Sequence, residues 1–235
     1  QLNTLATTQL NALNAQDLST TQIKAMDVTA IGNLSTTQAQ SLTAAQIGAM
    51  TTAGLDALSS EEVQGWNTTQ LGALTSQQLS KLSATAIADF SETQLTDLTS
   101  TQVRGFTTTQ LNSLGSTQLN ALEVADFSTA QVAGFDATAA AALSSTQAQG
   151  FSTAQIGALT STVIENLASD DIQAWSTEQL GALTTKQLSG LTTSAIANLS
   201  DTQLAGLTTT QVRAFTATQL NTLATTQLNA LNAQD

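Results

Sequence analysis

Serine and threonine hydroxyls are abundant in this sequence, but no residue is placed to activate them as nucleophiles. A hydroxyl needs an adjacent base, and the chain contains neither histidine nor cysteine. The lysines Lys24, Lys81 and Lys186 can accept a proton in principle, yet none stands in a Ser-x-x-Lys context. We interpret them, like Arg104 and Arg213, as solvated side chains, and we expect no enzyme activity.

Two pairs of adjacent carboxylates, Glu61–Glu62 and Asp170–Asp171, would serve acid–base chemistry or calcium binding if their oxygens converged. Adjacent residues at a helix start diverge, however, and complement the helix dipole there without any ligand. We favour this structural role, and weak Ca²⁺ binding stays as the alternative. The Gly-rich nonapeptide calcium pattern of RTX proteins is absent.

The two tryptophans, Trp66 and Trp175, are candidates for a platform on which sugars stack. Their place in the repeat described below favours burial in a core instead. No P-loop, dinucleotide fingerprint or zinc-ligand spacing occurs. The sequence therefore predicts no catalytic residue, no cofactor and no metal ligand.

Composition limits the partners of this 235-residue chain. The formal net charge is -12, but only 9% of residues are charged, and the five Lys and Arg are scattered. We exclude nucleic acid as a partner because there is no basic patch for phosphates. No apolar run approaches the ~20 residues of a membrane span. The absence of cysteine fits a secreted bacterial protein.

An eight-residue repeat runs along the whole chain, as in "SSEEVQGW" (59–66). Position eight is always Leu, Met, Phe or Trp, and position five is Leu, Ile or Val except for Ala at 39, 140 and 148. Position four is mostly Gln, and position one is usually Ser or Thr. Such repeats have to be recognised before any other feature is interpreted.

Two longer periods contain the octads. Residues 19–126 align without a gap with 128–235, a shift of thirteen octads and one five-residue unit, and residues 1–17 recur identically as 219–235. We predict one continuous array over 1–235, with copies at 1–109 and 110–218 and the start of a third at 219–235. Because the chain starts with Gln and shows no signal peptide, we expect it to begin inside a longer protein.

The octad predicts a short helix rather than a strand. Ser or Thr at position one and Gln or Glu at position four form a capping box, and the apolar residues beside them form a hydrophobic staple. A single long helix is excluded, because eight residues at ~100° each would wind the apolar stripe around it. The sequence thus predicts an all-α solenoid of very short capped helices that stack on one another.

Two five-residue units interrupt the octads, "NAQDL" (14–18) and "EVADF" (123–127). Each looks like an octad that lost its capping positions. We therefore expect 7–18 and 116–127 to run on as longer helices. The alternative fold is a β-solenoid, because threonine favours strands and fragments such as "ADFS" (88–91) are typical of pentapeptide-type coils.

The phrases "LSTTQI", "LTSTQV" and "LTTTQV" resemble very large repetitive bacterial proteins with arrays of L-[ST]-[ST]-x-Q-[IL]-x-x. These are often labelled as adhesin-like or haem-utilisation proteins. The resemblance covers the whole chain and implies a secreted or cell-surface location, with no catalytic residue to carry over. Haem ligation by His or Cys is not supported, because both are absent.

Three roles follow from these features. The first is a structural segment of an extracellular filament, stalk or adhesin shaft that associates with further copies of the same repeat. The second is a Thr-rich module that binds ice or a surface polysaccharide. The third is a scaffold inside the cell.

Overall fold

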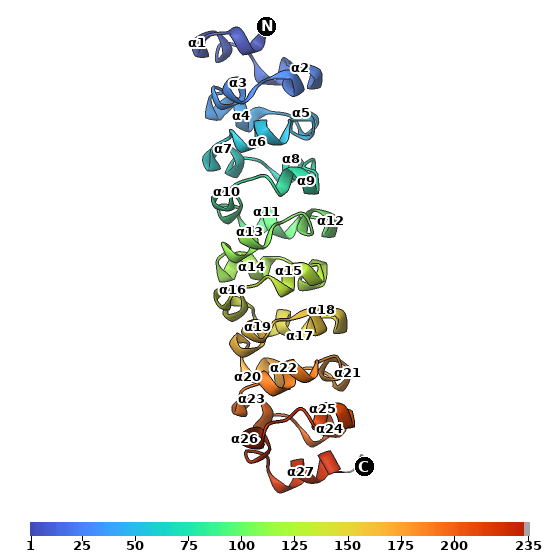
Figure 1. Cartoon of the computed structure of the whole chain (residues 1–235). Coiled ribbons are helices and arrows are strands. Elements are labelled where there is room, and N and C mark those ends of the chain that lie inside the picture. Colours follow the sequence, from blue (N-terminus) through green and yellow to red (C-terminus); the bar gives the residue numbers. More distant parts are fainter. Residues whose placement is uncertain (233–235) are drawn as a thin grey trace. The chain divides into compact units, whose positions relative to one another are not determined.

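Every regular element that the computed structural model describes is a helix (Figure 1). The structure describes residues 1–232, and within this range no residue forms a strand. The β-solenoid alternative is therefore wrong, and the prediction of an all-α solenoid of short helices is confirmed. The fragment "ADFS" is not a coil of strands, because Ala88 ends one helix and Ser91 caps the next.

The first of two compact units spans Gln1–Leu122. Its elements, with η for a 3-10 helix, are η1 Leu2–Thr4, α1 Thr7–Leu10, η2 Ala15–Asp17, α2 Thr20–Ala25, α3 Val28–Gly32, α4 Thr36–Ser41, α5 Ala44–Ala49, α6 Thr52–Asp56, α7 Ser60–Gln64, α8 Thr68–Gly72, α9 Ser76–Leu79, α10 Ala84–Ala88, α11 Glu92–Thr96, α12 Ser100–Val103, α13 Thr108–Asn112 and α14 Ser116–Ala121.

The second unit spans Glu123–Asp235. Its elements are η3 Val124–Asp126, α15 Thr129–Ala133, α16 Ala137–Ala142, α17 Ser145–Gln149, α18 Thr153–Ala158, α19 Ser161–Asn166, α20 Ser169–Gln173, α21 Thr177–Gly181, α22 Thr185–Gly190, α23 Thr193–Ala197, α24 Asp201–Ala205, α25 Thr209–Val212, α26 Ala217–Leu220 and α27 Thr225–Asn232.

Each octad forms one helix, and in most octads the first residue caps it as the sequence predicts. In α5 the Thr43 hydroxyl accepts a hydrogen bond from the main-chain N–H of Gln46. The side-chain oxygen of Gln46 accepts one from the main-chain N–H of Thr43. The helix then ends at two extended residues, Met50 (φ −61°, ψ 145°) and Thr51 (φ −72°, ψ 155°). The chain turns with these ordinary dihedrals, and no described residue has a positive φ.

Positions five and eight fill the core. Position five points inward from the helix and position eight from the extended connection, as Ile47 and Met50 do with 0% and 4% of their surfaces exposed. All the phenylalanines and both tryptophans are buried at position eight or its equivalent, which confirms them as core residues. In the second unit, Phe127 packs edge-on against Phe135 at 5.5 Å between ring centres.

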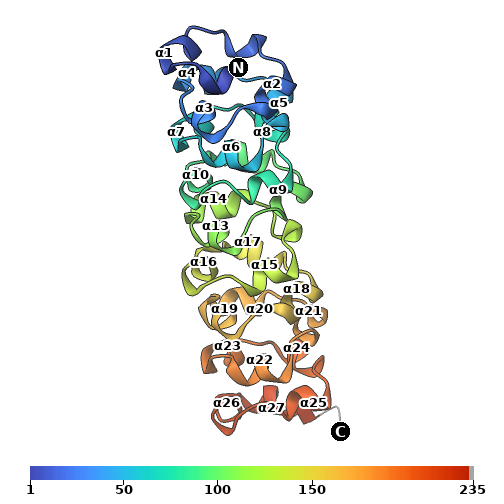
Figure 2. The same ribbon diagram turned by 45° about the horizontal axis from the view of Figure 1, so that its top comes forward.

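Within each unit, helices pack on the helix three places earlier. In the first unit α5 lies on α2 and α8 lies on α5, and both views show this order (Figures 1 and 2). In the second unit α18 lies on α15 and α21 on α18. Three octads therefore complete one superhelical turn.

The prediction for the five-residue units is wrong, because neither continues the helix before it. Leu122 is extended (φ −89°, ψ 139°) and ends α14, and Val124–Asp126 form a separate 3-10 turn. A continuous helix would spread positions 119, 122, 124 and 127 over about 200° of its circumference, so they would not share one core. The break at position eight turns Val124 and Phe127 inward, and both are buried.

A glycine at position seven permits close approach of two segments of the chain. A Cβ on Gly105 would lie 2.6 Å from the Cα and main-chain oxygen of Ser76 in α9. No side chain fits at that distance. Because Gly105 has no side chain, the main chain at this residue can contact Ser76 of α9 directly.

Candidate functional site

Where position four is glutamine, its side chain forms hydrogen bonds both within its own helix and to the preceding turn. In α9 the Oε1 atom of Gln78 accepts the main-chain N–H of Thr75 at 2.8 Å and the Thr75 hydroxyl at 3.0 Å. Its Nε2 group donates to the main-chain oxygens of Met50 at 2.9 Å and Ile47 at 3.3 Å. One buried amide thus caps its own helix and holds the preceding turn.

The same bond recurs along both units, always to the position-eight carbonyl of the preceding turn. We call this set the glutamine ladder. Its members within the described residues include Gln46, Gln70, Gln78, Gln94, Gln102, Gln110 and Gln118 in the first unit, and Gln155, Gln179, Gln187, Gln203, Gln211, Gln219 and Gln227 in the second.

The first five-residue unit, residues 14–18, does not interrupt the glutamine ladder. Gln38 lies one turn after residues 14–18, and its Nε2 donates to Leu13, 25 residues earlier, and to Leu10, 28 residues earlier. The usual spacings, as at Gln78, are 28 and 31, so both shrink by the three deleted residues. The single 3-10 turn η2 therefore replaces a whole helix as one side of the superhelical turn, and it packs against α4.

The capping box does not predict the ladder, although position four carries a signal for it. A capping box needs only an acceptor, which Glu supplies as well as Gln. The sequence uses Gln at most such positions and Glu only at Glu62. The preference for Gln over Glu indicates that the side-chain NH₂ group also has a hydrogen-bond partner.

The carboxylates at Glu62 and Asp171 occupy ladder positions but cannot donate. Glu62 is 7% exposed, and its Oε2 accepts the Ser59 main-chain N–H at 2.7 Å, which confirms its capping role. Asp171 is 4% exposed and makes no side-chain hydrogen bond, and its Oδ1 is enclosed without a partner among the described residues. Asp171 does not cap its helix as Glu62 does, because its side chain is one methylene shorter and its N-cap, Ala168, has no hydroxyl.

The two carboxylate pairs diverge as expected. Glu61 and Asp170 are not buried, whereas Glu62 and Asp171 are. Across residues 1–232, no three His, Cys, Asp or Glu side chains gather where they could hold a metal ion. Neither pair forms a convergent oxygen cluster in this structure.

The tryptophans do not form a platform for a ligand. Trp66 is 1% exposed and Trp175 is 2% exposed, so neither ring offers a face to a sugar. Their indole N–H groups donate to the main-chain oxygens of Ala39 and Ala148, at 2.9 and 2.7 Å. The prediction that they are core residues is confirmed.

The basic residues lie on the surface, as the sequence predicts. Their side chains are exposed at Lys24, Lys81, Arg104, Lys186 and Arg213. The side chains therefore do not enter the core. Within the described range, no helix is both long and apolar enough to pass through a membrane.

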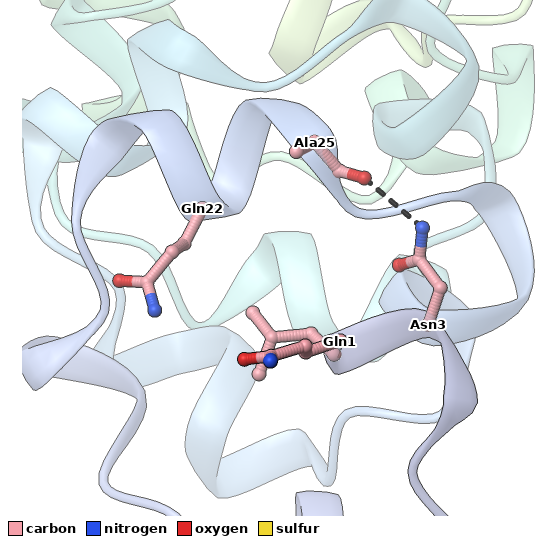
Figure 3. A pocket seen from close by; sticks show the side chains of 5 residues that line it. Gln1, Asn3, Gln22 and Ala25 are labelled. Carbon is pink, nitrogen blue, oxygen red and sulfur yellow. Dashed lines mark hydrogen bonds between the residues drawn. The ribbon is translucent and has the colours of Figure 1, made fainter.

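Two hollows in the first unit are lined mainly by polar groups. One of about 190 Å³ is lined by Gln1, Leu2, Asn3, Gln22 and Ala25, and there Asn3 donates to the Ala25 oxygen at 3.1 Å (Figure 3). The other, of about 490 Å³, is lined by amides and hydroxyls that include Gln16, Gln40, Thr43, Asn67 and Thr69. Neither holds an arrangement of acid, base and nucleophile.

Comparison with known proteins identifies a repeat-containing protein. The model of the family described as the ALTTAQ repeat matches residues 49–84 and 164–201, which include the octads of Trp66 and Trp175. No curated protein matches the chain. A crystal structure of the leucine-rich repeat-containing protein LegL7 from Legionella pneumophila aligns over 94% of this chain and 88% of that one. Its identity is 12% and its TM-score 0.26, so this likeness carries no argument about function.

Proposed function

We propose that the chain is a structural spacer, a segment of a large bacterial filament, stalk or adhesin shaft at the cell surface or outside the cell. The observation that supports this role is the constancy of the ladder. Gln78 and Gln187 occupy equivalent places in the two long copies, and both bind the preceding turn through carbonyls 28 and 31 residues earlier. A further turn can be added without altering any existing contact.

The test is to change the number of turns. Duplication of residues 67–90, the three octads of α8 to α10, adds one superhelical turn. Because packed helices lie 8–10 Å apart, each inserted turn lengthens the particle by about 10 Å. Small-angle scattering on chains with one, two and three insertions then gives a linear increase in maximum dimension. An increase that follows the cube root of chain length contradicts the proposal.

The location and the partner belong to the same proposal. The resemblance to repetitive bacterial surface proteins supports a secreted or cell-surface location, and the regular turns support association with further copies of the repeat. A scaffold inside the cell is the alternative location. The sequence that flanks this segment in its parent protein decides between them, because a secretion signal or an anchor would lie there.

A second candidate function is binding of a surface polysaccharide or ice. The open hollow of about 490 Å³, lined by hydroxyls and amides, favours it. The capping role of position one disfavours it, because hydroxyls such as that of Thr75 are already bonded within the helix. Glycan-array binding or thermal hysteresis by the purified chain is the discriminating measurement.

A further inference from the structure

The hollow of about 490 Å³ has an equivalent one superhelical turn further along the first unit. This third hollow, of about 540 Å³, is lined by Gln64, Trp66, Asn67, Thr68, Asp89, Ser91, Thr93 and Gln94. Each of these residues lies three octads after a residue that lines the 490 Å³ hollow, as Gln64 does after Gln40. Because three octads complete one turn, the two hollows occupy the same place in consecutive turns.

The two hollows meet at Asn67, which lines both of them. The helix that Asn67 caps, α8, packs on α5 on one side and on α11 on the other. Packed helices lie about 8–10 Å apart, so the hollows repeat at about that spacing. We call the pair the polar groove, and it crosses three successive turns of the first unit.

The polar groove presents hydrogen-bonding groups that the helix caps do not use. Thr69 and Thr93 are exposed at position three, and neither hydroxyl forms a hydrogen bond within the described residues. The exposed amide of Gln64 is also without a partner there. Asn67 accepts the main-chain N–H of Gln70 at 3.0 Å through its Oδ1, which leaves its Nδ2 group as a donor.

A glycine holds one amide of the groove in place. A Cβ on Gly65 would lie 2.3 Å from the Cδ atom of Gln40, so a side chain there would displace the Gln40 amide. With glycine present, the Nε2 group of Gln40 donates to the main-chain oxygen of Glu61 at 3.1 Å. This bond orders the side chain and leaves its Oε1 atom as an acceptor.

The chemistry of the lining selects an uncharged, hydroxyl-rich ligand. Hydroxyls and amides both donate and accept hydrogen bonds, as sugar hydroxyls do. Asp89 is the only charged residue among the described residues that line the two hollows, and the net charge of -12 repels anionic polymers. Trp66 is 1% exposed and offers no ring for stacking. Binding therefore depends on hydrogen bonds, and each hollow alone binds weakly.

We propose that the polar groove binds an extended, uncharged, β-linked glucan chain that runs across the turns and places successive sugars in the two hollows. An extended glycan repeats its hydroxyls at a fixed interval, and the groove repeats its hydroxyls and amides from turn to turn. A chain held in one hollow reaches the second as an intramolecular event, so affinity rises with length. This inference rests on the second candidate function and names its ligand and its surface.

Isothermal titration calorimetry of the whole chain with cellobiose and cellohexaose is the test. Cellohexaose is long enough to reach both hollows and is expected to bind at least roughly tenfold more tightly than cellobiose. Maltohexaose has the same composition, but its α-linked chain coils. It is expected to bind at least roughly tenfold more weakly than cellohexaose, because it does not follow both hollows at once.

The test variant is Asn67→Ser with Thr69→Glu. It changes octad 67–74 from "NTTQLGAL" to "STEQLGAL", which is the sequence of octad 176–183 in the second unit. Because Ser176 caps α21 in this chain, the variant octad is expected to keep its helix. The variant removes the amide that both hollows share and adds a carboxylate to the groove. Its affinity for cellohexaose is expected to fall at least tenfold.

The control is Thr107→Ser with Thr109→Glu, which places the same two residues at the same octad positions outside both hollows and leaves the affinity unchanged. Far-UV circular dichroism checks both folds. If the test variant loses helicity, Thr93→Glu, at an exposed side chain of the second hollow, replaces it and is expected to weaken binding equally.

Three results overturn the inference: no binding of cellohexaose by the wild type at millimolar sugar, equal affinities for cellohexaose and either cellobiose or maltohexaose, or a groove variant that binds like the wild type. The spacer proposal survives each of them, because turn insertion tests it separately. Binding of other sugars is tested by the glycan array, and ice by thermal hysteresis.

Discussion

The indole N–H of Trp66 donates to the main-chain oxygen of Ala39, 27 residues earlier in the sequence and one turn away in the superhelix. Trp175 and Ala148 repeat the arrangement in the second unit. Ala39 and Ala148 are two of the rare alanines at position five, where Leu, Ile or Val is the rule. The largest side chain of the repeat thus lies against the smallest one of the neighbouring turn.

This pairing predicts strong coupling between the two positions. Trp66→Leu removes core volume and the hydrogen bond from the indole to the Ala39 oxygen, so the free energy of unfolding falls by roughly 3 kcal/mol. Ala39→Leu overfills the same site and costs about 1–3 kcal/mol. The double variant restores a Leu–Leu contact typical of other octads, so its loss is smaller than the sum. Urea denaturation of all four chains measures the coupling, and strict additivity would contradict the pairing.

The ladder predicts that Gln and Glu are not equivalent at position four. Gln78→Glu keeps the capping acceptor but turns a carboxylate oxygen towards the carbonyls of Met50 and Ile47, which lowers the free energy of unfolding by about 3 kcal/mol. Because only the protonated carboxyl can donate, the folded state raises the pKa of the introduced group, and the loss shrinks as the pH falls. The adjacent variant Gln77→Glu, at an exposed side chain, is the matched control and is expected to change stability by under about 0.5 kcal/mol.

The reverse substitution is expected to stabilise the protein. Glu62→Gln retains the bonds to Ser59 and supplies the missing donor, which the spacing of the ladder directs to the Leu34 oxygen. The net gain of one hydrogen bond is about 1 kcal/mol. Thermal denaturation measures the Tm of Glu62→Gln and of Glu61→Gln, which makes the same charge change on an exposed neighbour. Equal shifts in Tm for the two variants would show that charge, and not the donor, is responsible.

Capping hydroxyls predict a smaller and local effect. The Thr107 hydroxyl accepts the Gln110 main-chain N–H at 3.2 Å, so Thr107→Ala is expected to cost about 1 kcal/mol, and Thr107→Ser is expected to cost much less. Thr109 is exposed in the same helix, and Thr109→Ala is expected to be nearly neutral. Chemical denaturation of the three variants gives the comparison. A loss at Thr109 as large as at Thr107 would contradict the capping role.

The local structure could be predicted from the sequence because each octad carries its own helix signal. Ser35 and Gln38, for example, form the expected capping box, and the apolar residues that flank them are buried. The spacing of these residues fixes where a helix begins and which face it buries. It contains no information about which helix, elsewhere in the chain, will lie against that face.

The arrangement between turns could not be predicted for that reason. The capping box accounts for the Oε1 atom of Gln78 but leaves its Nε2 group unassigned, and the partners Met50 and Ile47 lie a turn away. The prediction for the five-residue units is wrong for a related reason. Their missing caps suggested a continuous helix, but the core requires Leu122 to be extended, which ends the helix at that residue.

The most direct test of the account is the exchange rate of glutamine side-chain amide protons, measured by NMR. Gln77 and Gln78 are adjacent, but Gln77 is exposed whereas Gln78 is 5% exposed and bonded to the preceding turn. The ladder predicts that the Nε2 protons of Gln78 exchange at least roughly 100-fold more slowly than those of Gln77. Equal exchange rates at the two side chains would show that the ladder does not hold the turns together.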